Sequence, residues 1–413
     1  MKLKNNNKMC FVRLAFKLVL CGLLFSSCTE QYIMQTNTFE DILVVNGIVT
    51  NELRLQEIKL NRTYRLEEDK APFEKGANVY VTDSDNVVYE FEEDVNSYMS
   101  KSEFKAVPGK KYQLNIITKD GKSYSSTPET LTAESEVKVT PTIQTIDGEK
   151  GVQIDISSFD PTSQSKFYRY EYDETYKIVA PKWSPDKHVL APFVTPEGNP
   201  DFILVPRTNG ETKICYTTKK LDDLLLKSTI GLTEDRTDFP IRFISVKDPI
   251  IRERYSIVVR QYVQNLASYT YYKTLKDLSI SKSILSQTQT GFNYGNLKSN
   301  DDASEKIVGY FEVSSVSSQR LFFNFRDVFP KEANYPPYFI DCTEENLPNC
   351  WERFCGGPKI LSYINSISFL YYARIPDRSP GRNSDYSAYI FVPADCGDCT
   401  KFSSNIKPLF WVD

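Results

Sequence analysis

Short runs of alternating apolar and polar residues, separated by turn signals, make up most of the chain. An unbroken apolar run at 42–45 is typical of a strand that is buried on both faces. Apolar and polar residues alternate at 77–82 and at 111–116, as expected of strands with one buried face. An Asp-Gly pair at 120–121 is a strong hairpin signal. Closely spaced short strands of this kind predict an immunoglobulin-like β-sandwich over residues 41–133.

A larger β-rich domain is predicted over residues 134–413. Within it, Tyr168, Tyr170 and Tyr172 place three phenol rings on one face of an expected strand. Flat aromatic faces can stack on sugars or peptides, so this ladder is one candidate binding platform. A sheet face covered by a neighbouring element is the commoner arrangement, and we expect that one.

A single helical insertion is predicted near 266–280, with Asn265 as its N-cap. A strand-like pattern resumes at 307–325. Three apolar side chains fall on one side of the predicted helix: Tyr271, Leu275 and Leu278. The chain is therefore expected to be mostly β, with one helix set among the strands of the second domain.

The first 27 residues have the pattern of a secretory signal. Five basic residues precede an apolar stretch at 18–25, and no acidic residue occurs before Glu30. The apolar stretch is far shorter than the ~20 residues that cross a bilayer. We predict that residues 1–27 are a signal peptide and are removed.

Cys28 follows two serines directly, at the expected cleavage point. This arrangement resembles the bacterial lipobox, in which the cysteine thiol receives a diacylglyceryl group and its freed amine a further acyl chain. Phe25 stands where leucine is usual, and a signal peptide with an unmodified cysteine is the alternative. Because several acyl chains anchor a protein firmly, we predict a lipidated Cys28 and a polar tether over residues 28–40.

Composition argues against several classes of function. The formal net charge is −4, with 50 basic and 54 acidic residues mixed along the chain, so no electrostatic footprint for nucleic acid is present. His188 is the one histidine, which excludes zinc and iron sites that need two histidines. It lies in a proline-rich stretch and is predicted to be a loop residue without a catalytic role.

Adjacent acidic residues occur at 92–94 and 222–223. A glycosidase needs two carboxylates facing each other across a cleft. Neighbouring residues of a strand point to opposite faces of its sheet. We therefore interpret these acids as solvated surface, and we expect no enzyme and no cofactor.

Residues 83–86 form a polar turn signal that resembles the start of a calcium-binding loop. The position that requires glycine holds Val88, and the closing position holds Asp94 instead of glutamate. A turn without calcium is the preferred interpretation.

Six cysteines follow Cys28: Cys215, Cys342, Cys350, Cys355, Cys396 and Cys399. An even number in an exported protein favours disulfides, although the sequence does not choose among the pairings. Five of the six lie in the tail at 338–413, which we predict to be a loop-rich, disulfide-stapled segment. A zinc site built on the two cysteine pairs and a redox-active CxxC at 396–399 remain open as alternatives.

Several short motifs, in a fixed order along the chain, resemble the Bacteroidota lipoproteins grouped as domain of unknown function 4249. The resemblance covers almost the whole chain from Leu43 to Trp411. The motifs are LVVNG at 43–47, GANV at 76–79, PGKKY at 108–112, DGKSY at 120–124, YSIVVRQ at 255–261, GNL at 295–297, GYF at 309–311, CGDC at 396–399 and KPLFW at 407–411.

This resemblance implies an outer-membrane lipoprotein, often encoded beside a TonB-dependent receptor of the SusC type, and it implies no activity. We expect an accessory binding or assembly subunit of such a transporter, anchored to the membrane by lipid. An envelope-assembly scaffold without a small ligand is the first alternative, and a carboxylate-based hydrolase is the second. The membrane face and the ligand stay open.

Overall fold

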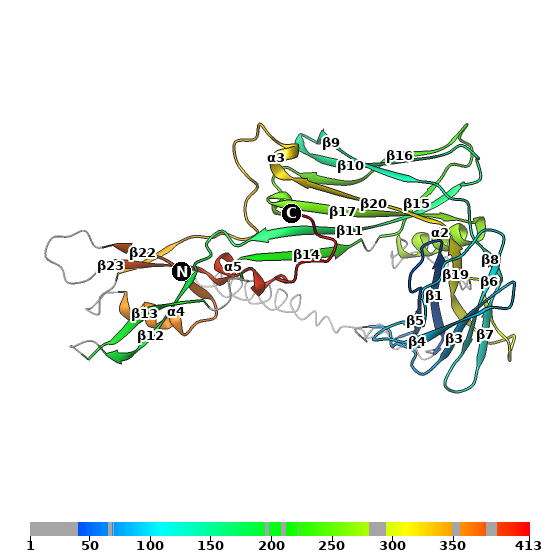
Figure 1. The fold of residues 1–413 in the computed structure, drawn as a ribbon, viewed down its shortest axis with the longest axis horizontal. Coiled ribbons are helices and arrows are strands. Elements are labelled where there is room, and N and C mark those ends of the chain that lie inside the picture. The colour runs from blue at the N-terminus through cyan, green and yellow to red at the C-terminus, as the bar shows by residue number, and fades with distance from the viewer. Residues whose placement is uncertain are drawn as a thin grey trace, which may run out of the picture.

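Three units built largely of strands follow one another along the long axis of the molecule (Figure 1). The signal peptide, Cys28, Asp222, Cys350 and Cys355 lie outside the described residues. The computed structural model describes residues 40–64, 68, 70–194, 198–207, 212–221, 223–280, 295–348, 356–376 and 386–413.

The N-terminal unit is one sheet of ten strands that surrounds a single apolar core. Its hydrogen-bonded order is β18-β7-β6-β3-β4-β5-β2-β1-β19, and β8 pairs with β6. Buried side chains from both ends of this order share the core, so the sheet curves around it. The strands are β1 (Leu43–Thr50), β2 (Glu57–Arg62), β3 (Asn78–Asp83), β4 (Val88–Glu93), β5 (Tyr98–Ser100), β6 (Lys111–Ile117), β7 (Ser123–Ser126), β8 (Glu129–Thr130), β18 (Leu297–Ser299) and β19 (Ile307–Ser314).

The last two strands come from far beyond residue 133, where the first predicted domain ends. β19 runs parallel to β1, in register from Leu43 opposite Ile307 to Thr50 opposite Ser314. Gly309 permits this pairing, because a Cβ there would lie 1.9 Å from the Val45 carbonyl oxygen. The N-terminal unit is therefore completed by a segment that follows most of the central unit in the sequence.

Two facing sheets form the central unit, which we call the central sandwich. Its first sheet consists of β9 (Val137–Ile146), β10 (Glu149–Asp160) and β16 (Asp235–Ser245). The second consists of β14 (Ile214–Lys220), β15 (Leu225–Ser228), β11 (Phe167–Val179), β17 (Arg254–Gln264) and β20 (Val316–Asn324), with short helices η2 (Pro249–Ile251) and α3 (Phe325–Val328) at its end.

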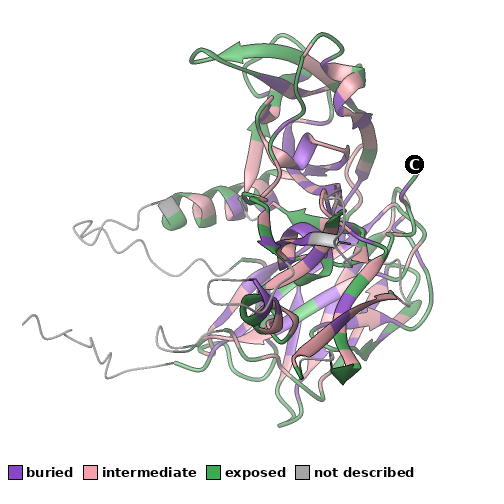
Figure 2. Ribbon diagram, turned by 90° about the vertical axis from the view of Figure 1, so that its left-hand side faces the viewer, coloured by how far each residue is buried: buried purple, intermediate pink, exposed green. Residues whose placement is uncertain are grey.

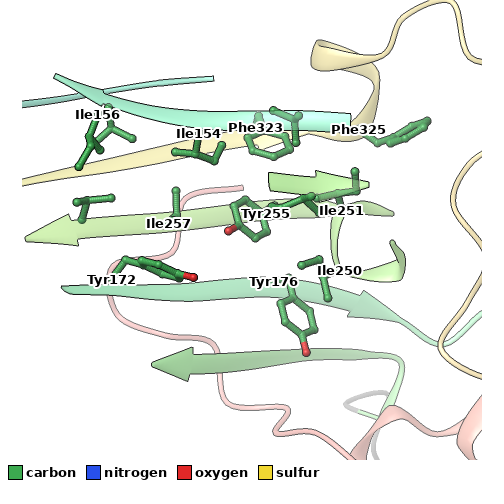
Figure 3. Packing of buried hydrophobic residues seen from close by; sticks show 14 of the residues in the cluster. Ile154, Ile156, Tyr172, Tyr176, Ile250, Ile251, Tyr255, Ile257, Phe323 and Phe325 are labelled. Carbon is green, nitrogen blue, oxygen red and sulfur yellow. The ribbon is translucent and has the colours of Figure 1, made fainter. Parts of the chain in front are cut away.

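Isoleucine side chains from one layer of the central sandwich meet tyrosine and phenylalanine rings from the other (Figure 3). Ile154 of β10 and Tyr255 of β17 are both completely buried there. Buried and exposed positions alternate along many of the strands (Figure 2), as expected where one face of a sheet is packed. The mostly β fold predicted from the sequence is confirmed.

The third unit, which we call the arm, comprises residues 186–206 and 345–393 and lies at the end of the molecule opposite the N-terminal sheet (Figure 1). Its elements are the hairpin β12 (Asp186–Val194) and β13 (Pro200–Pro206), the sheet of β21 (Glu345–Pro348), β22 (Phe369–Pro376) and β23 (Tyr386–Pro393), and helix α4 (Gly357–Ile364). These elements share a small core of their own. The expectation of a loop-rich tail was therefore wrong, since much of the tail pairs into a sheet.

Two disulfides fasten the C-terminal segment to the rest of the chain, as the fold prediction expected. Cys215 of β14 bonds to Cys399 in η3 (Cys399–Lys401), 184 residues away in sequence. Cys342 bonds to Cys396 in α5 (Ala394–Gly397). The CxxC cysteines thus bond to two distant partners and not to each other, which contradicts both the redox-motif and the zinc alternatives for this pair.

Helix α2 (Leu266–Ile280) forms where it was predicted. The Ser268 amide donates to Asn265 Oδ1 at 2.8 Å, so Asn265 is the N-cap. Of the three apolar residues on one side of the helix, Tyr271 packs against Tyr310 with ring centres 5.2 Å apart, whereas Leu275 and Leu278 are exposed. Ser268 and Tyr272 are the buried positions. The buried face of the helix is polar because it lies against the ion pair between Arg169 and Glu312.

Candidate ligand-binding site

A cavity of about 380 Å³ lies between the N-terminal unit and the central sandwich. Small-molecule sites favour such boundaries between folded units, and this volume is within their usual range of about 300–1,000 Å³. The N-terminal unit contributes Asn46, Ile48, Arg54, Glu57 and Lys59. The central sandwich and α2 contribute Arg169, Glu171, Tyr172, Asp173, Lys220, Leu221, Leu224, Arg260, Tyr262 and Tyr272.

Arg169 of β11 is the most deeply buried charge in the lining, with 5% of its surface exposed. Its guanidinium packs against two tyrosine rings, 4.3 Å from the ring centre of Tyr262 and 4.9 Å from that of Tyr272. Nη2 pairs with Glu312 of β19 at 2.5 Å, and Nη1 pairs with Glu171. Arg169 therefore joins the central sandwich to the N-terminal unit through a buried ion pair.

Glu312 is held in place by neutral donors as well. Gln264 Nε2 and Ser268 Oγ donate to its Oε2 at 3.0 and 2.6 Å. Burial alone would lower the pKa of Arg169, but the Glu312 and Glu171 carboxylates together with the Tyr272 and Tyr262 hydroxyls more than offset this, and the pKa is raised. The arginine is charged, and its charge is compensated mainly from beneath the cavity.

The carboxylates that line the cavity are all engaged. Asp173 accepts from Arg260 at 2.7 Å, and Glu57 lies 3.6 Å from Lys59. Glu171 accepts from Arg169 and, at 3.4 Å, from the Tyr262 hydroxyl. The carboxylate oxygens of the lining are thus largely occupied by hydrogen bonds and ion pairs within the protein.

Several donors of the same lining have no acceptor among the described residues. The buried Nε atoms of Arg169 and Arg54 make no hydrogen bond, the nearest carboxylate oxygen to Arg54 Nε being that of Glu52 at 3.7 Å. Lys220 makes no ion pair with the described part of the chain. The Tyr272 hydroxyl is likewise without a described hydrogen-bond partner. The two Nε atoms are enclosed by the protein, so the donors that the lining offers to a ligand rich in acceptors are the exposed Lys220 ammonium and the Tyr272 hydroxyl.

The tyrosine ladder of β11 is a covered sheet face, the arrangement preferred from the sequence. Tyr168 and Tyr170 are completely buried in the central core, and Tyr172 is nearly so. Arg169, Glu171 and Asp173 alternate with the tyrosines and line the cavity, which Tyr172 also reaches. The charged residues alternating with the tyrosines were visible in sequence, but no local signal separates a buried arginine from an exposed one.

His188 is not a loop residue, which corrects the prediction. It lies in β12 with 7% of its surface exposed, and its ring centre is 4.3 Å from that of Tyr389 and 5.4 Å from that of Phe202. Neither ring nitrogen has a hydrogen-bond partner within the described chain. Burial in this aromatic core lowers the pKa of His188 from 6.5 to about 4, so the imidazole is neutral near pH 7.

The turn at 83–86 has a lysine where a calcium ion would have to sit. Lys110 Nζ lies 2.8 Å from Asp83 Oδ2 and 2.7 Å from Asp85 Oδ2, while Asp83 Oδ1 accepts from the Asp85 and Val87 amides. Burial would raise the pKa of Asp83, but these hydrogen bonds lower it below its ordinary value. The residues form an ammonium-bridged turn, as the preferred interpretation expected.

The other sequence candidates do not converge. Residues 92–94 are exposed on the N-terminal unit, and Asp223 is exposed while Asp222 lies outside the described residues. No group of three or more His, Cys, Asp and Glu side chains within the described ranges could hold a metal ion. A second cavity, of about 490 Å³, is lined in part by Phe339 and Phe402 beside the disulfides, but its Glu174 and Arg242 are already paired with each other.

The fold and this cavity define a multi-unit β protein with a charged, aromatic-lined site between two of its units. The chain belongs to the family described as domain of unknown function (DUF4249), whose model matches residues 29–320. That range includes every residue that lines the cavity. No curated protein matches the chain. In the part of the chain that the structure describes, no helix is long and apolar enough to cross a membrane.

Proposed function

We propose that this protein is a lipid-anchored, non-catalytic binding subunit that serves a TonB-dependent transporter of the outer membrane. The observation that carries the binding role is the cavity between the N-terminal unit and the central sandwich, with its buried Arg169 and its unpartnered donors. A site between two units can also report occupancy to a partner, since a ligand that contacts both units changes the stability of their contact.

The anchoring part of the proposal rests on residues 1–28. A basic segment, a short apolar segment and small residues before Cys28 support export and lipidation. The Cys28→Ser variant is expected to leave the membrane fraction, with the wild-type chain as the control. Retention of Cys28→Ser on membranes after high-salt washing would overturn the lipid anchor.

The transporter part rests on the resemblance of the motifs to lipoproteins encoded beside such receptors. The test is recovery of the affinity-tagged full chain from its native outer membrane in a mild detergent. Stoichiometric co-purification of a TonB-dependent barrel is the expected result. Recovery of the chain with no barrel, from membranes in which the barrel is present, would overturn this part.

An envelope-assembly scaffold is the second candidate, and the arm favours it. The arm lies at one end of the molecule, and it exposes Phe193 and Val194 of β12, at 57% and 61% of their surface. Leu190 of the same strand is exposed as well, at 41%, and a contiguous patch of exposed apolar side chains is what marks a protein contact. Recovery of envelope-assembly proteins in place of a barrel, with no small ligand bound, would make the scaffold the better proposal.

A further inference from the structure

We infer that the cavity between the N-terminal unit and the central sandwich binds a small molecule that carries a carboxylate on a ring. This inference rests on the proposed binding function and names the class of its ligand. It follows from two features of the lining, the imbalance of unused donors and acceptors and the aromatic surface around Arg169.

The imbalance determines the charge of the ligand. Each of the three lining carboxylates has a basic partner from the protein, whereas Lys220 has none in the described part of the chain. A cationic ligand would have to break one of these pairs. An anionic ligand would need to break none, and charge-assisted hydrogen bonds to its oxygens are the strong kind.

Lys220 is the residue best placed to supply charge without structural cost. It lies on β14 directly opposite Asp173 in the register, yet the Asp173 carboxylate is bonded to Arg260 at 2.7 Å. Its ammonium is therefore available to a molecule in the cavity. A carboxylate fits this group better than a phosphate dianion would, because Glu57, Glu171 and Asp173 also face the cavity and would repel the higher charge.

The tyrosines explain why a ring is expected beside the carboxylate. Tyr262 and Tyr272 both pack against the Arg169 guanidinium and line the same cavity. Tyr272 brings both a ring and a hydroxyl that has no described partner. Aromatic side chains of this kind contact sugar or aromatic rings through apolar surface while the hydroxyl donates to an acceptor. A uronic acid and an aromatic acid share this chemistry.

Two matched pairs of probes test the inference on the full chain purified in a mild detergent. D-Glucuronate and D-glucose differ at the carboxylate, and benzoate and benzamide differ in charge on the same ring. We expect at least one acid to bind about tenfold more tightly than its neutral counterpart, measured by titration calorimetry or by ligand-observed NMR at millimolar concentration. Binding of glucuronate points to an acidic saccharide, and binding of benzoate alone points to an aromatic acid.

Neighbouring lysines of β14 provide the matched variants. Lys220 lines this cavity, while Lys219 lines the separate cavity beside Phe339. Lys220→Met is expected to weaken binding of the acid about tenfold and Lys219→Met to leave it unchanged, although both remove one positive charge. Both variants are first checked for an unchanged unfolding midpoint, since both lysines are exposed.

Equal binding of acid and neutral probe in both pairs, or no binding of any probe, would overturn the carboxylate assignment. Equal weakening by the two lysine variants would overturn it too, by showing a general charge effect. Co-purification of a barrel separates this outcome from failure of the proposed function. If a barrel co-purifies but no acid binds more tightly than its neutral counterpart, only the proposed ligand class is contradicted. If an acid binds selectively but no barrel co-purifies, only the transporter role is contradicted.

Discussion

The ion pair between Arg169 and Glu312 makes the strongest prediction about how the two units are held together. Glu312 is 1% exposed and accepts from Arg169, Gln264 and Ser268. Replacing Glu312 with glutamine keeps the shape and most of the hydrogen bonding but leaves a guanidinium buried without its main counter-charge. Removing one member of a buried pair costs about 3–5 kcal/mol. We expect about 3 kcal/mol for Glu312→Gln, because Glu171 still contacts Arg169.

A double-mutant cycle separates the pair itself from the cost of an unpaired charge. Arg169→Met and Glu312→Leu, each made alone, should also destabilise the protein, since each leaves one charge of the pair buried without its partner. The combination of Arg169→Met with Glu312→Leu should cost clearly less than the sum of the single changes, because apolar side chains of similar size can replace a buried pair with little loss. Glu171→Gln is the matched control, since it removes a carboxylate from the same arginine at a position that is 44% exposed. It should cost less than about 1 kcal/mol.

Urea unfolding followed by tryptophan fluorescence measures these differences. Trp411 packs against Tyr216 and Phe322 of the central sandwich, with ring centres 5.1 and 5.7 Å away, so its emission reports on that unit. If Glu312→Gln costs no more than Glu171→Gln, or if the double variant costs the full sum, the buried pair does not join the units as argued here.

Three further predictions concern other parts of the fold. The pKa of His188 is lowered to about 4 in the folded protein, so the unfolded chain binds a proton at higher pH than the folded chain does. The arm should therefore lose about 3 kcal/mol of unfolding free energy as the pH falls from 6.5 to 4. In acid unfolding titrations, His188→Phe should remove this pH dependence. Gly309→Ala should prevent stable folding, because the added Cβ would meet the Val45 carbonyl. Gly121→Ala, which has open space around it, should cost only about 1 kcal/mol of stability in thermal unfolding. Equal effects of the two variants would contradict the close approach of β19 to β1 at Gly309. Replacing both Cys342 and Cys396 with serine opens a disulfide loop of 54 residues and should destabilise the protein by up to about 4 kcal/mol. An unchanged unfolding midpoint would contradict a stabilising role for this disulfide.

Much of the secondary structure is local and could be predicted from the sequence. Alternation at 77–82 and 111–116 gave β3 and β6, and the Asp-Gly pair gave the hairpin into β7. Asn265 began helix α2 as expected. These features depend on side-chain periodicity, turn geometry and capping, each of which involves residues only a few positions apart.

The candidate site could not be predicted in the same way. The strand pattern at 307–325 reads as one stretch, yet β19 pairs with β1 in the N-terminal sheet while β20 pairs with β17 in the central sandwich. That division brings Glu312 beneath Arg169. A charge is buried or exposed according to what packs over it, and here the partner carboxylate of Glu312 is 143 residues away in sequence.

The chain's sequence by itself determined a mostly β protein with an export signal pattern and one capped helix, because these follow from composition and short-range spacing. Tertiary structure decided which cysteines pair, that His188 is enclosed by aromatic rings, and that Arg169 lies at the boundary of two units. Each of these depends on contacts between segments that are distant in sequence. Bringing such segments together costs conformational entropy, which is offset only by the contacts of the complete fold.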